Sequence, residues 1–251
     1  MAKQWFQKFN KKINPHRTIT QIMQISHCNF PEGILYDLDN FIWIKKDDRD
    51  ESVFTLGATT ILAALAGKLT KIKLKEIGTT VEKNKSVASI ESLRYFGMVR
   101  SPVKGKIIEV NNALSSNPKS VNDFPYDDGW FVKIKTQYSD ATNDSDFNTE
   151  NLKLINECHD EIKKLIDKLH IRCFSAFPDY EMFEIGVECA ATLTKLDELI
   201  GKIDLGNVVH VVSDDTSADL EMIRWSEERE QSLLEYRKEG TLYHFIVKKI
   251  K

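Results

Sequence analysis

The cysteines are the side chains of this chain that could act as nucleophiles, and there are four of them: Cys28, Cys158, Cys173 and Cys189. Cys189 is the candidate catalytic residue, because it lies where the strand pattern "EMFEIGVE" ends and the helical pattern "ATLTKLDELIGKI" begins. Backbone N–H groups and the helix dipole at such a position stabilise a thiolate, the reactive form of cysteine. Glu188 and Glu184 oppose this effect, since nearby negative charge raises the pKa of a thiol. The position also suits a buried structural cysteine.

The other three cysteines offer less chemistry. Cys158 falls on the apolar face of a helical pattern, so we expect it in a core. Cys173, in "IRCFSAF", is a second candidate, as a relay thiol. Cys28 stands beside His27, but no second pair of ligands accompanies them, and no metal site is predicted. Because the cysteines are widely spaced and lack a C-x-x-C pair, we expect free thiols and a cytoplasmic protein.

Composition excludes several classes of protein. The length of 251 residues suits one or two domains. A net charge of −3 with 29% charged residues argues against nucleic-acid binding, which normally requires a basic excess. No apolar stretch is long enough to span a bilayer. No catalytic triad, P-loop or dinucleotide fingerprint is present, and the pairs Asp47–Asp48 and Asp214–Asp215 are expected at turns and helix caps.

The first half of the chain reads as an all-β domain. Residues 30–136 contain many short strand patterns with turn residues between them, which predicts a small barrel or sandwich with one short helix at 59–67. Turns are expected at Gly78, Gly97 and Gly105, among others. Residues 1–29 are predicted to form a basic arm without acidic residues. The arm either binds a partner or an anionic surface, or it is a frayed terminus that packs its aromatic side chains on the body.

The second half reads as an α+β domain. The segment 137–151 is rich in Asp, Asn, Ser and Thr and is predicted to be a linker. A connecting helix and loop occupy 152–180. Residues 181–251 then give the order β-α-β-α-β-β, which predicts two amphipathic helices on one face of a mixed sheet. The fold class is therefore α+β in two domains.

Three stretches of the first half carry a family resemblance: "FPEGILYDLDNFIWIK", "GTTVEKNKSVASIESLR" and "SPVKGKIIEVNNAL". They resemble the glycine-cleavage H protein and its lipoyl-bearing relatives, and "ESLRYFGMVRSPV" is closest to the lipoate-binding proteins of heterodisulfide-reductase-like sulfur oxidation. The resemblance implies a barrel-sandwich hybrid with lipoate joined to a lysine at a hairpin tip. Here that position is Arg94, and Glu91 matches the acid nearby.

Arg94 changes what the resemblance implies. A guanidinium stays protonated and cannot attack an acyl-adenylate, so no lipoate cofactor is expected. Lys104, in the neighbouring turn, is expected to be a solvated turn residue rather than a substitute acceptor. Arg94 itself is either a solvated tip residue or a fixed cation for the carboxylates or phosphates of a partner.

Residues 181–251 resemble the TusA family of sulfur carriers, on "FEIGVECAATLTKLDELI", "GNVVHVVSDDTSADLEMIRWSEE" and "LLEYRKEGTLYHFIVKK". The resemblance implies a transient persulfide on Cys189. This chain departs from the family pattern in one respect: the family follows its cysteine with prolines, whereas "CAAT" stands at 189–192.

The two resemblances together predict a sulfur-trafficking protein. Its H-protein-like domain would dock without lipoate, and Cys189 would carry the sulfur, as a sulfurtransferase-like carrier rather than a turnover enzyme. Its partners would be proteins of sulfur transfer or of lipoyl-type complexes, and the pathway a heterodisulfide-reductase-like one. The first alternative is a non-catalytic scaffold or regulator built from degenerate carrier domains. The second is a lipoyl carrier with an unusual acceptor, which Arg94 disfavours.

Overall fold

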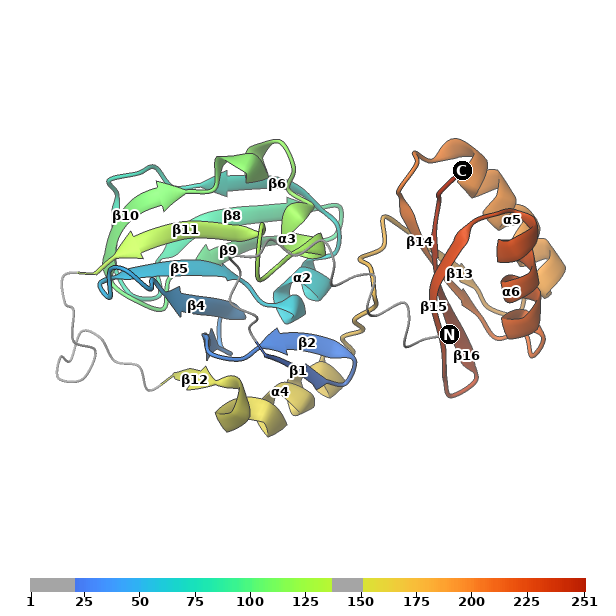
Figure 1. Cartoon of the computed structure of the whole chain (residues 1–251), viewed down its shortest axis with the longest axis horizontal. Helices are drawn as coiled ribbons and strands as arrows, with labels where there is room; N and C mark the ends of the chain where they lie inside the picture. The colour runs from blue at the N-terminus through green and yellow to red at the C-terminus, as the bar shows by residue number, and fades with distance from the viewer. Residues whose placement is uncertain (1–20, 137–150) are drawn as a thin grey trace.

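The computed structural model describes residues 21–136 and 151–251. They form an N-terminal body, residues 21–136 and 151–168, and a C-terminal domain, residues 180–251, which lie side by side (Figure 1). Residues 169–179 join the two and are called the crossover loop below. No helix among the described residues combines the length and the apolar character that crossing a membrane requires.

The N-terminal body is built on two β-sheets. The larger sheet has the order β12-β3-β4-β5-β11-β10-β7 and the smaller has the order β6-β8-β9. Their strands are β3 Leu35–Asp37, β4 Ile42–Lys46, β5 Val53–Ala58, β6 Leu69–Leu74, β7 Thr80–Val81, β8 Ser86–Ser92, β9 Phe96–Arg100, β10 Gly105–Val110, β11 Trp130–Lys135 and β12 Leu152–Leu154. The predicted β-rich sandwich is thus confirmed for this part of the chain.

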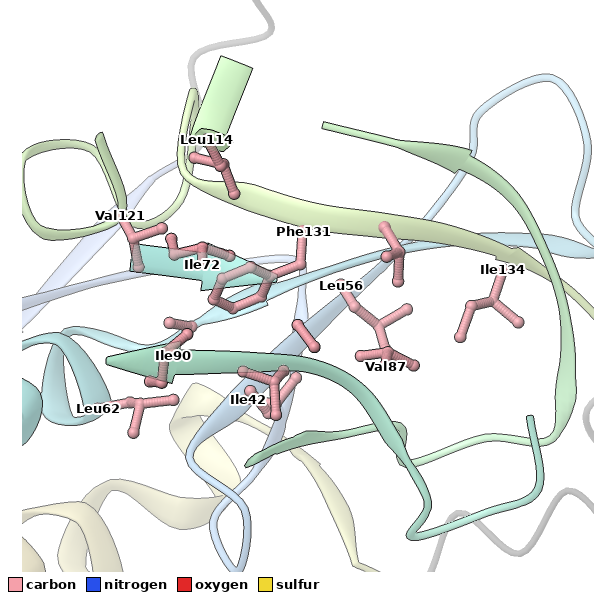
Figure 2. Packing of buried hydrophobic residues seen from close by; sticks show 14 of the residues in the cluster. Ile42, Leu56, Leu62, Ile72, Val87, Ile90, Leu114, Val121, Phe131 and Ile134 are labelled. Carbon is pink, nitrogen blue, oxygen red and sulfur yellow. The ribbon is translucent and has the colours of Figure 1, made fainter. Parts of the chain in front are cut away.

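The core of this sandwich comes from the inward side chains of both sheets. Branched residues suit strands because they pack well on a pleated surface. Figure 2 shows Ile42 and Leu56 of the larger sheet facing Val87 and Ile90 of the smaller one, with Phe131 between them. Helix α2, Thr60–Ala66, closes one end and is capped by the Thr59 hydroxyl, much as the predicted helix at 59–67. The short helices η2, Asn112–Ser115, and α3, Ser120–Asp123, lie in the β10–β11 connection.

The β8–β9 hairpin turns at residues 93–95, and Ser92 N–H donates to Tyr95 C=O at 2.9 Å. Gly97, which was expected at a turn, lies inside β9 instead. The reason is packing, because a Cβ at Gly97 would stand 2.5 Å from ring atoms of Tyr95. The glycine therefore makes room for an aromatic ring against the backbone.

Residues 21–31 form a hairpin of β1, Ile22–Ile25, and β2, Cys28–Pro31, which corrects the prediction of an arm as far as residue 29. Its two-residue turn has positive φ at Ser26 (46°) and His27 (67°), the geometry that matches the twist of a tight hairpin. Residues 1–20, which carry most of the predicted basic arm, lie outside the described residues.

The connecting helix belongs in space to the N-terminal body. β12 pairs with β3, and helix α4, Ile155–Lys168, packs its apolar face beside β1 and β2. Cys158 is buried in this cluster, as predicted from its place on the apolar face. The chain therefore passes between its two parts after α4, in the crossover loop, and not in the polar segment 137–151.

The C-terminal domain has the predicted order β-α-β-α-β-β. Its elements are β13 Tyr180–Glu184, α5 Cys189–Lys202, β14 Val208–Ser213, α6 Ala218–Glu228, β15 Ser232–Glu239 and β16 Leu242–Lys248. The sheet order is β13-β14-β16-β15, and both helices cover one face (Figure 1). Strand β13 ends at Glu184, earlier than predicted, because Gly186 turns the chain at a φ of 71°.

Candidate functional site

Arg94 lies in the exposed turn between β8 and β9, where the sequence predicted a hairpin tip. Its guanidinium folds back over α2, with Nη2 3.5 Å from the carbonyl oxygen of Ala64. Gly67 leaves space for it, since a Cβ there would stand 2.7 Å from Arg94 Nε. Arg94 Nη1 also lies 3.4 Å from Glu181 Oε2 in β13. The tip residue is therefore an exposed cation held by the chain's own C-terminal domain.

The two neighbours singled out in the sequence have their own ion pairs. Glu91 Oε2 lies 3.8 Å from Lys71 Nζ. Lys104 Nζ lies 3.3 Å from Glu82 Oε2, in the turn that precedes β10. Both pairs are substantially exposed, so each contributes little to stability.

Apolar side chains stand exposed around the hairpin tip. Leu93 is fully exposed, and Phe96 and Met98 are 66% and 50% exposed on β9, which lies at the edge of its sheet. Phe96 and Met98 are two residues apart in a strand, so they project from the same face. We call Leu93, Phe96 and Met98 the hairpin patch. An exposed apolar group on an edge strand is typical of a protein-contact surface.

Cys189 is the first residue of α5, as predicted, but its surroundings disfavour a thiolate. The residue is 3% exposed, and its backbone N–H donates to Asp215 Oδ2 at 2.8 Å. Burial raises the pKa of the thiol to about 12, aided by a hydrogen bond to Glu221 and by the negative charges of Glu221 and Asp215. The opposing carboxylates therefore come from α6 and the loop before it, and not from Glu188.

Glu184, the other acid expected near the thiol, forms an ion pair with a lysine of α5 instead. Its Oε2 lies 2.5 Å from Lys195 Nζ on α5. The pair Asp214–Asp215 caps backbone as predicted, with Asp214 Oδ1 accepting from Gly186 N–H at 2.8 Å and Asp215 Oδ1 from Ser217 N–H at 2.8 Å. Asp47 likewise accepts from the turn N–H of Arg49 at 2.8 Å.

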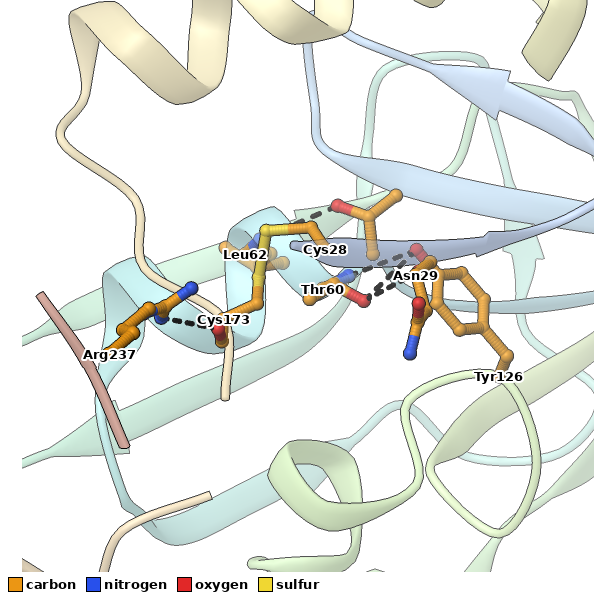
Figure 3. Close-up of a disulfide and its surroundings, with 8 residues drawn as sticks. Cys28, Asn29, Thr60, Leu62, Tyr126, Cys173 and Arg237 are labelled. Carbon is orange, nitrogen blue, oxygen red and sulfur yellow. Dashed lines mark hydrogen bonds between the residues drawn. A yellow bond between two sulfur atoms is a disulfide. The ribbon is translucent and has the colours of Figure 1, made fainter. Parts of the chain in front are cut away.

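Cys28 and Cys173 form a disulfide, which corrects the expectation that the thiols are free (Figure 3). Their Cα atoms lie 5.0 Å apart across a sequence separation of 145 residues. The bond joins β2 to the crossover loop. It removes Cys28 from a metal-binding role and Cys173 from the role of a free relay thiol. Among the described residues, no group of three His, Cys, Asp or Glu side chains is arranged to hold a metal ion.

A cavity of about 520 Å³ lies between α2, the crossover loop and the C-terminal sheet. Its lining includes Arg94, Cys173, Phe174, Glu181, His210 and His244.

The two histidines of this cavity were not anticipated from the sequence. His210 and His244 lie on neighbouring strands with their rings stacked, and His210 Nε2 is 2.9 Å from His244 Nδ1. Both are almost fully buried. Burial lowers the pKa of His210 to about 3, and the nearby His244 lowers it further, so the imidazole is neutral near pH 7. A signal was present in "VVHVV", where a titratable residue interrupts a buried apolar strand.

Asp179 fixes the C-terminal domain against the N-terminal body. Its side chain is almost fully buried, with Lys68 Nζ at 2.9 Å and Lys119 Nζ at 3.2 Å. It also accepts from Val208 N–H at 2.9 Å. Burial acts to raise the pKa of this carboxyl, but the hydrogen bonds from Lys68 and Val208 and the charge of Lys119 outweigh it and hold the pKa below its usual range. One carboxylate thus ties two lysines of the body to the first strands of the domain.

Comparison with known proteins places a family match on the N-terminal body. The family model described as "Glycine cleavage H-protein" matches residues 35–163, which end within α4. "Glycine cleavage system H protein 5" of Aquifex aeolicus is 47% identical over 116 residues, covering 45% of this chain and 76% of that protein.

A second relative and a solved structure are also similar to this chain. "Glycine cleavage system H protein 3" of Aquifex aeolicus is 37% identical over 146 residues, covering 58% of this chain and 88% of that protein. A crystal structure of a glycine cleavage system H protein from Mycobacterium marinum aligns with a TM-score of 0.45 at 22% identity, over 53% of this chain and 98% of that one.

Proposed function

Because this chain belongs to the glycine cleavage H-protein family, we propose that its N-terminal body docks to partner proteins as an H-protein-like module without a lipoyl group at Arg94. The observation that carries the proposal is Arg94 itself, exposed at the β8–β9 tip with no amine to accept lipoate. The resemblance seen in the hairpin sequence supports the proposal, since Arg94 would correspond to the modified lysine of the family. A guanidinium here can form a bidentate contact with a partner carboxylate, but it cannot form the amide.

The hairpin patch supports docking. Leu93, Phe96 and Met98 leave apolar area in water beside a fixed cation, and covering a large apolar side chain gains about 1.5–3 kcal/mol. Interfaces are enriched in aromatic residues, Met and Arg at their centres, and this patch has that composition. A partner that covers the tip would compete with Glu181 for Arg94, so docking and the position of the C-terminal domain would be linked.

Photo-crosslinking in the native host tests the docking surface. A photoreactive residue at Phe96 should give a crosslinked partner that excess unlabelled chain competes away. The matched control is Ile77, which is 60% exposed in the β6–β7 connection. If Phe96 and Ile77 give the same crosslinks, the hairpin patch is not the docking surface.

A second candidate function is sulfur carriage on Cys189, which the position of this residue at a helix start favours. Cys189 is the first residue of α5, as the TusA resemblance would require of a carrier cysteine, whereas its hydrogen bond to Glu221 works against ionisation of the thiol. In the reaction, a donor persulfide R–S–SH passes its outer sulfur to the Cys189 thiol, giving Cys189–S–SH and R–SH. The buried, protonated thiol must first be released from Glu221, which makes loading dependent on movement of α6.

A sulfur-transfer assay with a persulfide donor distinguishes a sulfur carrier from a non-catalytic scaffold. Wild-type protein and Cys158→Ala should accept sulfur, whereas Cys189→Ala should not, as read by peptide mass. Cys158 is the matched control because it is also a buried, free cysteine. If Cys189→Ala accepts as much sulfur as wild type, the scaffold alternative replaces the carrier, and docking by the hairpin patch is unaffected.

A further inference from the structure

The cavity between the two parts of the chain has a disulfide in its wall, and nothing in the docking role accounts for it. We propose that this cavity is a thiol–disulfide exchange site, at which a dithiol reduces the Cys28–Cys173 bond by attack on Cys173 Sγ. The proposal does not depend on docking by the hairpin patch or on sulfur carriage by Cys189.

Access to the two sulfur atoms is unequal. Cys173 belongs to the cavity lining and is 9% exposed. Cys28, in β2, is 0% exposed and belongs to the same buried cluster as Phe30 and Tyr36. Exchange requires a thiolate to approach one sulfur along the S–S axis, so access decides which sulfur is attacked. Cys173 is therefore the attacked residue and Cys28 is the leaving group.

Two buried histidine nitrogens in the cavity wall need a partner. His210 Nδ1 and His244 Nε2 have no hydrogen-bond partner among the described residues. A buried polar atom without a partner costs free energy, which a bound molecule can relieve. His244 Nε2 lies 3.7 Å from the Glu239 carboxylate. We assign the proton of His244 to that nitrogen, because it then faces the negative charge.

This assignment fixes what His210 can do. His244 Nδ1 is then the acceptor for His210 Nε2–H, and His210 Nδ1 keeps a free lone pair. A neutral imidazole nitrogen of this kind accepts a hydrogen bond from a thiol S–H. A dithiol that enters as a monothiolate has one such S–H to donate. His210 would thus position the second thiol while the first attacks.

Two cationic side chains in the cavity lining favour the thiolate form of the entering dithiol. The side chains of Arg94 and Arg172 line it, although each also contacts a carboxylate, Glu181 and Glu239 respectively. Nearby guanidinium groups favour the anionic form of a thiol. The two guanidinium groups in the lining therefore favour binding of a dithiol that carries one negative charge.

The loop on either side of Cys173 is held independently of the disulfide. Arg237 Nη2 donates to the Cys173 carbonyl oxygen at 2.8 Å, as Figure 3 shows. The Arg237 guanidinium also lies 4.5 Å from the ring centre of Phe174, which packs at the same distance on His210. These contacts would keep Cys173 facing the cavity after the S–S bond breaks.

The dithiol supplies both electrons that reduce the Cys28–Cys173 disulfide. Its thiolate attacks Cys173 Sγ, which forms a mixed disulfide and releases Cys28 as a thiolate. The second thiol passes its proton to Cys28, directly or through solvent, and attacks the dithiol sulfur of the mixed disulfide. Cys173 leaves as a thiolate and takes a proton from solvent. The dithiol loses two electrons and becomes a cyclic disulfide, and the protein gains two thiols.

Single-cysteine trapping tests which sulfur is attacked. In Cys28→Ala the free Cys173 should form a mixed disulfide with 2-hydroxyethyl disulfide at least ten times faster than the free Cys28 does in Cys173→Ala. Peptide mass assigns the modified residue and separates it from Cys158 and Cys189. Equal rates, or faster reaction of Cys28, would overturn the proposed direction of attack.

Narrowing the cavity tests whether the reductant enters it. Ala176→Phe, in the cavity lining, should slow reduction of the native disulfide by dithiothreitol at least fivefold, measured by alkylation and intact mass. The control is Ala113→Phe on the exposed surface of η2, which should react like wild type. Circular dichroism checks that both variants fold.

The alternative is that the Cys28–Cys173 disulfide has only a structural role and does not exchange with a dithiol in the cavity. If Ala176→Phe reacts as fast as wild type, or if wild-type reduction is no faster than global unfolding measured in the same buffer, the cavity is not an exchange site.

Discussion

Arg94 Nη1, at the tip of the β8–β9 hairpin, lies 3.4 Å from Glu181 Oε2, in the first strand of the C-terminal domain. The pair spans two parts of the chain with separate cores. It connects the residue at which the family resemblance places a swinging arm to the domain that follows. The tip is therefore a contact point between the two parts, and its apolar side chains stay exposed.

Glu181→Gln should change the free energy of unfolding by less than about 1 kcal/mol, because both side chains are more than a third exposed and the pair is screened by water. The hairpin should nevertheless lose protection in amide hydrogen exchange at residues 92–96. Glu51→Gln is the control, since it breaks an exposed pair with Lys46 within the N-terminal body. Equal protection of the hairpin in wild type and Glu181→Gln would show that the pair does not hold the tip.

Gly67→Ala should displace the Arg94 guanidinium. Gly67 has a φ of 72°, and an added Cβ would stand 2.7 Å from Arg94 Nε. Backbone strain of this kind costs about 1–3 kcal/mol. Gly33→Ala separates strain from displacement, because Gly33 has a φ of 77° and no atom within 4 Å of an added Cβ. Both variants should be destabilised in urea, and in crystal structures only Gly67→Ala should break the contact with Glu181.

Asp179→Asn should destabilise the packing of the two parts by about 2–4 kcal/mol at neutral pH, because two lysines would lose a buried carboxylate. The folded pKa of Asp179 is depressed, so its contribution is complete above the unfolded pKa of about 3.9 and disappears as the pH falls through the folded value. Urea unfolding of wild type and variant should therefore converge in acid. Asp50→Asn, at an exposed carboxylate, should have a smaller effect. A difference that persists unchanged at low pH would contradict the ion-pair explanation.

Cys189 should alkylate slowly with iodoacetamide at pH 8, by about a thousandfold relative to an ordinary thiol, because its pKa is raised to about 12. The rate should rise with pH beyond the range in which ordinary thiols have already ionised. Glu221→Gln should accelerate alkylation by about tenfold for each unit by which the thiol pKa falls. Glu188→Gln, which the sequence had marked for this role, should leave the rate unchanged. Acceleration by Glu188→Gln alone would show that the acids are wrongly assigned.

The sequence predicted the helices and strands that depend on local residue patterns. Strand alternation located β3, β4, β5 and β11, and the helical periods located α4, α5 and α6 within a few residues. The position of Cys189 at a helix start followed from the same periodicity. Arg94 was expected at a hairpin tip from the family resemblance, and the strand patterns on either side of it agree with that position.

What the sequence did not predict depends on contacts between distant segments. The Cys28–Cys173 disulfide joins residues 145 apart, and no spacing rule points to it. Glu221 approaches Cys189 only because α6 packs beside α5, and the Arg94–Glu181 pair forms only because the crossover loop brings the C-terminal domain back to the hairpin. The buried histidine pair likewise requires the pairing of β14 with β16.

We propose that the β8–β9 hairpin keeps the frame of a lipoyl-bearing relative and that Arg94 alone prevents modification. Wild-type protein and Arg94→Lys are incubated with lipoate ligase, ATP and lipoate, and their intact masses are compared. We expect no added lipoyl group on wild type and one added group on Arg94→Lys, located at residue 94 by peptide mass. Lipoylation of the wild-type chain at any lysine would contradict it.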